Sequence, residues 1–160
     1  MTNLVLDSDA LIKLTKSGLI KNIAKTSKLN ISEEVFKEVV VEGKVRLYED
    51  AFKIEEMVKR GILKKLKVKK IKDNLELGSG ETSTLNLYKE KKFDLIVSDD
   101  RKFLNVLEQM GVEFTTPVGL IVALVKSKGL DKEKAINGIK NIKNLIREDA
   151  YNSAINEIGG

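Results

Sequence analysis

The sequence predicts an α/β domain built on a parallel sheet of four to five strands. Short apolar runs alternate along the chain with segments of helical periodicity, as they do in parallel α/β proteins. Two of these runs, Asn3–Leu6 and Leu95–Ser98, lead directly into pairs of acidic residues. Sheets of this class bind ligands outside the carboxyl ends of their strands, so we expect these acids to share one crevice.

The individual elements follow from the same patterns. The predicted strands are Asn3–Leu6, Leu29–Ile31, Leu63–Val68, Leu95–Ser98 and Val112–Phe114. Helices are predicted near Ala10–Lys16, Leu19–Thr26, Glu33–Val41, Tyr48–Arg60, Glu81–Lys92 and Lys102–Met110, and then from Pro117, from Lys132 to about Arg147, and in a last piece reaching about Ile158. Three polar residues are placed as helix N-caps: Ser32, Thr116 and Asp131.

The length of 160 residues indicates a single domain, residues 1–160, with a core at about 1–120 and a helical extension at about 117–158. The helix that begins at Pro117 carries an apolar stripe, formed by Val118, Ile121, Val122 and Val125. This stripe fits packing on the same domain and an oligomer or partner surface equally well, so both alternatives stay open.

Composition restricts the chemistry. The chain contains no cysteine and no histidine, which excludes disulfides, thiol catalysis, a Ser-His-Asp triad and the usual zinc sites. Oxygen is then the available type of metal ligand, and oxygen ligands favour Mg²⁺ or Mn²⁺. No secretion signal is visible and the longest apolar stretch, Val118–Val125, is too short to span a bilayer, so we expect a cytoplasmic protein without a membrane anchor.

The net charge is +5, and much of the basic excess lies in one stretch, Lys59–Lys70. A basic flank beside an acidic crevice suits a polyanion that is held by its phosphates. The alternative is an exposed strand edge that lysines protect from pairing.

Acidic residues after the two strands are the first candidates for a site. Asp7 follows the first strand directly and could be a ligand or the cap of the next helix, whereas Asp9 is expected to be that cap. Asp99 and Asp100 repel each other unless something pairs them, so at least one is expected to be functional and one could cap the following helix.

Two helices supply further acids. Glu81 shares a helix face with Leu85 and Tyr88, which directs its carboxylate towards the sheet, although the helix dipole alone would also favour a glutamate there. Glu38 lies at the edge of another apolar stripe and can reach the rim of the crevice, and Glu42 is a rival one turn later.

Taken together, these residues resemble a PIN domain, the metal-dependent nuclease fold of VapC-type toxins and of RNA-processing enzymes. Four stretches carry the resemblance over roughly residues 3–120: Val5–Ile12, Ile31–Val39, Gly80-Glu81 and Ile96–Phe103. The resemblance implies a three-layer α/β/α fold with additional C-terminal helices. Many toxin-type members carry aspartate where this chain has Glu81, so the chain is more similar to a subgroup with a Gly-Glu helix start and a helical C-terminal tail.

The resemblance also implies functional residues. The implied catalytic acids are Asp7, Glu38, Glu81 and Asp100, the implied ligands of Mg²⁺ or Mn²⁺ are Asp7, Glu81, Asp99 and Asp100, and the implied substrate contacts are Ser8, Ser98, Arg101 and Lys102. The expected activity is metal-dependent endonucleolytic cleavage of RNA. The expected partners are RNA, a second copy of the chain and an antitoxin if the protein is the toxin of a toxin–antitoxin pair. RNA processing outside a toxin system is the alternative role.

Two other functions fit part of the sequence. Asp7 and Asp9 resemble the first motif of haloacid-dehalogenase-like phosphatases, as nucleophile and general acid, with Asp99 and Asp100 as Mg²⁺ ligands. That hypothesis leaves the two helix glutamates without a role. The other alternative is a degenerate, non-catalytic PIN scaffold, which the retention of all the acidic positions disfavours.

Overall fold

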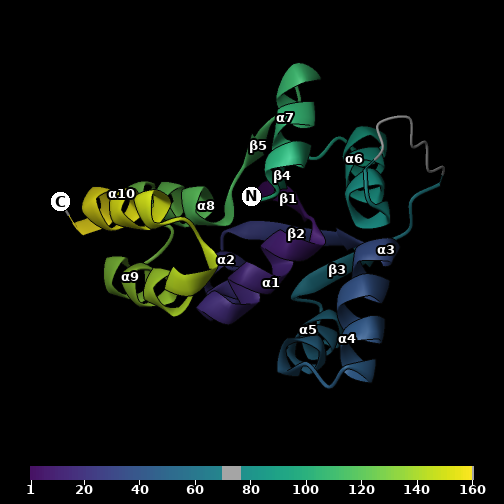
Figure 1. Ribbon diagram of the computed structural model, residues 1–160, viewed down its shortest axis with the longest axis horizontal. Coiled ribbons are helices and arrows are strands. Elements are labelled where there is room, and N and C mark those ends of the chain that lie inside the picture. Colours follow the sequence, from purple (N-terminus) through teal and green to yellow (C-terminus); the bar gives the residue numbers. More distant parts are fainter. Residues whose placement is uncertain (70–76, 160) are drawn as a thin grey trace.

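The computed structural model describes residues 1–69 and 77–159, in which helices cover both faces of a parallel sheet (Figure 1). Across the sheet the strands are β3 (Leu63–Leu66), β2 (Ser27–Ser32), β1 (Thr2–Leu6), β4 (Leu95–Val97) and β5 (Phe114–Thr115). Every neighbouring pair is parallel. The predicted α/β class, with a three-layer α/β/α arrangement and a sheet of four to five strands, is therefore confirmed.

The helices connect these strands and continue after them. They are α1 (Ser8–Ser17), α2 (Ile20–Ile23), α3 (Glu33–Phe36), the π-helix η1 (Lys37–Val41), α4 (Glu42–Val45), α5 (Glu49–Lys59), α6 (Ser79–Lys91), α7 (Arg101–Gln109), α8 (Pro117–Lys126), α9 (Lys132–Asn141), the 3₁₀-helix η2 (Lys143–Leu145) and α10 (Glu148–Gly159). None of the helices in the described ranges combines the length and the hydropathy that a membrane crossing needs.

Alternation along β1 divides the core between the two faces of the sheet. Leu4 and Leu6 point into the larger hydrophobic cluster, with α1, α5 and the C-terminal helices. Val5 points to the other face, where residues of α6 and α7 cover the sheet. Figure 1 shows α6 and α7 on the opposite side of the strands from α1 and α5. The central strand β1 is thus fixed from both faces, and so is the acidic segment that follows it.

The three predicted caps are confirmed. The hydroxyl of Ser32 accepts a hydrogen bond from the Val35 N–H, and that of Thr116 accepts one from the Gly119 N–H. The Asp131 carboxylate does the same at the start of α9. The apolar stripe of α8 lies in the larger core cluster, where Val118, Ile121 and Val122 are buried within this chain.

Two predicted helices are shorter than expected. The helix predicted at Leu19–Thr26 ends at Ile23, because β2 already begins at Ser27, opposite Thr2 of β1. The helix predicted from Lys132 to about Arg147 ends at Asn141. The next residue, Ile142, is fully buried, and the chain turns there through η2 so that α10 can pack on α8 and α9.

Strand boundaries also differ from the predicted ones, and pairing explains the differences at β3 and β5. The strand predicted at Leu63–Val68 ends at Leu66, because its partner β2 ends at Ser32. The strand predicted at Val112–Phe114 is Phe114–Thr115, because only these residues pair with β4.

Much of the basic stretch lies at an edge of the sheet. β3 is the outermost strand, its Lys64 and Lys65 are exposed, and the Lys65 ammonium lies 4.4 Å from the centre of the Phe36 ring. This placement matches the alternative of a strand edge protected by lysines. Lys70, the last residue of the stretch, lies outside the described residues.

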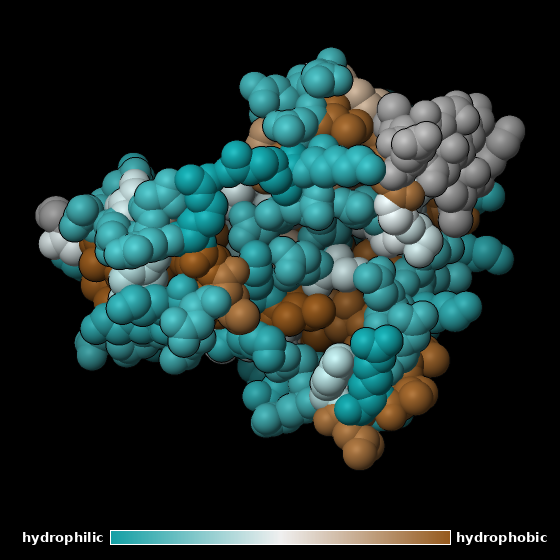
Figure 2. Space-filling view, viewed as in Figure 1, coloured by the Kyte–Doolittle hydropathy of each residue, from teal (hydrophilic) through white to brown (hydrophobic). Residues whose placement is uncertain are grey.

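An apolar surface lies at the far end of α4 and α5. Figure 2 shows hydrophobic side chains gathered there, at the lower right of the molecule. Val45 is 81% exposed and Leu47 is 80% exposed, while Val41, Tyr48 and Phe52 are about half exposed. Large apolar side chains grouped in this way are typical of contact surfaces.

Candidate active site

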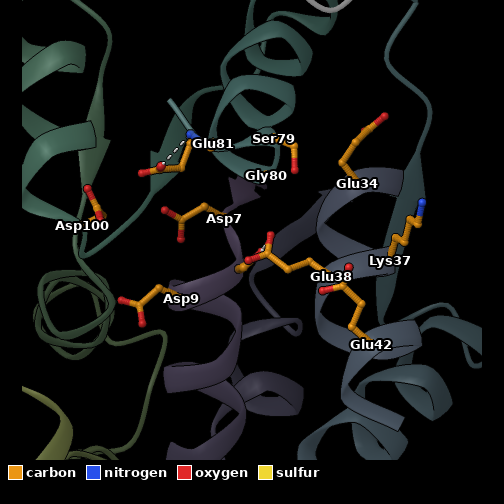
Figure 3. Close-up of a pocket in the computed structure, with 12 residues that line it drawn as sticks. Asp7, Asp9, Glu34, Lys37, Glu38, Glu42, Ser79, Gly80, Glu81 and Asp100 are labelled. Atoms are coloured by element: carbon orange, nitrogen blue, oxygen red, sulfur yellow. Dashed lines mark hydrogen bonds between the residues drawn. The ribbon is translucent and has the colours of Figure 1, made fainter. Parts of the chain in front are cut away.

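A pocket of about 600 Å³ opens at the carboxyl ends of β1 and β4, between α1, α3, η1 and the start of α6 (Figure 3). Seven carboxylates line it: Asp7, Asp9, Glu34, Glu38, Glu42, Glu81 and Asp100. The structure therefore brings together all four residues that were expected to be catalytic, from four separate segments of the chain. Ser8 also lines the pocket.

Asp7 lies at the centre of this group and is buried, with 2% of its surface exposed. One carboxylate oxygen, Oδ1, accepts a hydrogen bond from the Ala10 N–H at 2.9 Å and so caps α1. The other, Oδ2, accepts one from the Ser98 hydroxyl at 2.5 Å. The two alternatives for Asp7, helix cap and pocket acid, are therefore both realised in one side chain, whereas Asp9 is not the cap.

Burial disfavours the charged form of Asp7. It raises the pKa of this carboxyl from 3.8 to about 7, against the opposing effect of the hydrogen bonds from Ser98 and Ala10. The nearby carboxylates of Asp9 and Glu81 raise the pKa further. A cation beside this buried carboxyl would stabilise its charged form.

Glu81 faces Asp7 from the first turn of α6 (Figure 3). Its Oε1 accepts a hydrogen bond from the Gly78 N–H at 3.4 Å, which leaves Oε2 buried without a hydrogen-bond partner. Burial raises the pKa of Glu81, and the Asp100 carboxylate raises it further. In the structure the Glu81 side chain points towards the sheet, as its place on the helix face predicts.

The adjacent acids after β4 lie in different environments. Asp100 lines the pocket and caps α7, because its Oδ1 accepts a hydrogen bond from the Phe103 N–H at 2.9 Å. The Asp99 carboxylate instead lies 2.7 Å from the Lys13 ammonium and lines a neighbouring pocket. As positioned, Asp100 belongs to the candidate site and Asp99 does not.

Ser98 was expected to contact substrate, but it is fully buried behind Asp7. Its hydroxyl donates to Asp7 and accepts a hydrogen bond from the Asp100 N–H at 3.2 Å. This arrangement ties the acid after β1 to the acid after β4. Ser98 therefore orients the carboxylates from inside the protein.

Glu38 reaches the pocket from η1, where its Oε2 accepts a hydrogen bond from the Ser8 hydroxyl at 2.9 Å. A Cβ atom at Gly80 would lie 2.7 Å from the same Oε2, so glycine permits α6 to approach this closely. Glu42, the rival candidate, also lines the pocket but makes no such contact with α1. The π-turn at Lys37–Val41 is a feature often found at functional sites.

Two charged residues that line the pocket were not predicted, namely Glu34 and Lys37. Glu34 lies in the first turn of α3, and its spacing of four from Glu38 could have placed both on one face. Its Oε2 is buried without a hydrogen-bond partner. Within the described part of the chain, Lys37 is the basic residue that lines the pocket.

The two basic residues expected to bind substrate lie exposed at the start of α7. Lys102 is close enough to the pocket that its charge acts on Glu81, where it favours the ionised carboxylate. Arg101 lines the neighbouring pocket together with Lys13 and Asp99.

The pocket offers the kind of ligating atoms that divalent cations bind. The ligating atoms on offer are carboxylate oxygens, two of them buried and unpartnered, around an Asp7 carboxyl that burial keeps from ionising freely. Among residues 1–69 and 77–159, no three carboxylates are already close enough together to hold one ion. Binding of an ion therefore requires the side chains around the pocket to close in on it.

Comparison with known protein families gives one match over almost the whole chain. The family model DUF3368, described as a PIN domain, matches residues 3–160. No curated protein matches the sequence.

Proposed function

The chain belongs to the PIN domain family, whose members are generally nucleases that use divalent metal ions and act on RNA, and on that premise we propose that it is a Mg²⁺- or Mn²⁺-dependent endoribonuclease. The observation that carries this proposal is a pair of acids in a pocket lined by carboxylates: the buried Asp7 with its raised pKa, and the partly buried Glu81 with a buried, unpartnered oxygen.

Asp7, Glu81 and Asp100 are proposed to hold the ion. When bound, a divalent cation lowers the pKa of water and neutralises the negative charge of the scissile phosphate. The protein supplies the geometry: Ser98 holds the Asp7 carboxylate, and the caps of α1 and α7 fix two of the three acids to helix starts. Glu38, held by Ser8, is proposed to orient the attacking water.

RNA is the proposed substrate, bound through its backbone. Lys37 at the pocket and Lys102 beside Glu81 provide positive charge next to the acids, and Arg101 extends it along α7. Ser8 at the pocket wall is a further candidate contact. A chain with eight aromatic residues offers few stacking platforms, which favours recognition of the backbone over that of the bases.

The biological role proposed first is that of a VapC-like toxin, with a second copy of the chain and a small antitoxin as protein partners in the cytoplasm. The apolar surface of α4 and α5, with Val45 and Leu47 exposed, supports a contact with another protein. RNA processing outside a toxin system is the alternative role for the same activity.

The test is cleavage of a mixed, labelled RNA pool in Mg²⁺, Mn²⁺ or EDTA by the wild type, Asp7→Asn and Asp131→Asn. Asp131 caps α9 as Asp7 caps α1 but does not line the pocket, so its variant controls for the cap substitution and for contaminating nuclease. We expect cleavage by the wild type and by Asp131→Asn with metal, and none by a folded Asp7→Asn.

Equal cleavage by Asp7→Asn would contradict the proposed site. Absence of cleavage with either metal would turn attention to phosphatase assays, which test the haloacid-dehalogenase-like alternative, and to the non-catalytic scaffold. Circular dichroism of all three proteins establishes that each comparison is made between folded chains.

A further inference from the structure

Lys13 lies on α1 between the acids that follow the two central strands. Its ammonium is 3.1 Å from Asp9 Oδ2, one turn earlier on the helix, and 2.7 Å from Asp99 Oδ2 after β4. The lysine side chain is 13% exposed, so these ion pairs are largely shielded from water on the lysine side. One partly buried cation thus joins two acids from segments 90 residues apart in the sequence.

These ion pairs divide the acids into two sets. Asp9 and Asp99 both form an ion pair with Lys13, and the Asp99 carboxylate is held in the neighbouring pocket. In the part of the chain that the structure describes, Asp7, Glu81 and Asp100 form no ion pair with a lysine or arginine. Among the described acids at this edge of the sheet, Asp9 and Asp99 thus share a cation that Asp7, Glu81 and Asp100 do not contact.

We propose that Lys13 is a built-in counter-cation that withholds Asp9 and Asp99 from the metal site, so that the site binds a single divalent ion. The proposal rests on the metal site of the proposed function and goes beyond it by assigning a positioning role to Lys13. Two-metal nucleases place their ions about 3.5–4 Å apart and need carboxylates on both sides of the pair. Here the acids that could complete a second ion site already have a cation between them.

The test counts bound ions directly, without substrate. Mn²⁺ is titrated into each metal-free protein, and free Mn²⁺ is followed by its electron paramagnetic resonance signal. Two variants change Lys13: Lys13→Met removes the charge and keeps the length of the side chain, and Lys13→Arg keeps the charge. Two further single variants, Asp99→Asn and Asp100→Asn, each change one of the adjacent acids.

We expect one Mn²⁺ per wild-type chain. Lys13→Met is expected to bind a second ion, or to bind the first about tenfold more tightly, because an adjacent charge shifts cation affinity at a carboxylate by an order of magnitude or more. Lys13→Arg is expected to match the wild type. Asp100→Asn is expected to bind Mn²⁺ at least about tenfold more weakly, whereas Asp99→Asn is expected to retain the wild-type affinity.

Three results would overturn the role of Lys13 while leaving the metal site intact. They are two ions per wild-type chain, a Lys13→Met variant with wild-type stoichiometry and affinity, or equal weakening by Asp99→Asn and Asp100→Asn. If Lys13→Met does not fold by circular dichroism, the two asparagine variants still show whether Asp99 is withheld from the ion, and two ions per wild-type chain would still overturn the proposal. Failure of the wild type to bind Mn²⁺ would instead overturn the proposed metal site itself, and the role of Lys13 with it.

Discussion

Asp7→Asn should make the metal-free protein more stable at pH 8, although it removes a central residue of the proposed site. Burial raises the pKa of Asp7 to about 7 in the folded protein, against 3.8 for the ordinary carboxyl. Between these values the folded protein holds a proton that the unfolded chain has released. The free energy of unfolding of the wild type therefore falls as pH rises from about 4 to about 7.

The size of the effect follows from the pKa difference. A shift of about 3 pH units corresponds to about 4 kcal/mol at 1.4 kcal/mol per unit, which is an upper bound for a buried carboxyl. Asparagine keeps an oxygen for the Ala10 N–H but replaces the acceptor for Ser98 with a donor, a change of about 1 kcal/mol. We expect a net stabilisation of about 2 kcal/mol at pH 8, or a rise in Tm of about 4–8 °C.

The assay is urea unfolding of both proteins in EDTA at pH 5 and pH 8. The chain has no histidine and no cysteine, so the side chains that most often titrate in this range are absent. Burial of Glu81 acts in the same direction as that of Asp7, and the difference between the two proteins isolates Asp7. A wild type whose stability is unchanged from pH 5 to pH 8, or an Asp7→Asn variant that is the less stable protein at pH 8, would refute the reasoning.

Three further expectations concern the same pocket. Saturating Mn²⁺ at pH 8 should raise the Tm of the wild type, because an ion that binds only the folded state stabilises it, and should leave Asp7→Asn nearly unchanged in a thermal-shift assay. Gly80→Ala should lower RNA cleavage by tenfold or more while changing the free energy of unfolding by about 1 kcal/mol or less, because the added Cβ meets the flexible end of Glu38; cleavage at the wild-type rate would contradict this. Ser98→Ala should weaken Mn²⁺ binding and cost about 1–2 kcal/mol in urea unfolding, because the Asp7 carboxylate and the Asp100 N–H both lose a buried partner.

Local patterns were enough to predict the sheet and the acids at its edge. Asp7 follows β1 directly and Asp100 comes shortly after β4, so the strand positions alone place both carboxylates at the same edge of a parallel sheet. Glu81 could be directed towards the sheet because helical periodicity fixes its face. The caps at Ser32 and Thr116 are equally local, since each depends on residues within one turn.

Local sequence patterns could not predict the features that depend on tertiary packing. The ion pair of Lys13 with Asp99 joins residues 86 positions apart, and no periodicity relates them. The π-turn that carries Glu38 arises where η1 packs against neighbouring helices, in a segment whose sequence reads as an ordinary helix. The position of Ser98 could not be predicted either. The sequence places it beside the acids but does not show whether it faces the pocket or the protein interior.

The two oxygens of Asp7 have separate tasks, and the same division applies to Asp100. In each residue Oδ1 starts a helix by accepting a backbone N–H, which leaves Oδ2 for other contacts, and in Asp7 that oxygen accepts the hydrogen bond from Ser98. Asparagine can reproduce the first task and not the second. Under the proposed function, a chain carrying both substitutions should therefore keep its helices and its surface and no longer cleave RNA. Such a protein would retain bound RNA intact, and sequencing what it captures from cells would identify the natural targets.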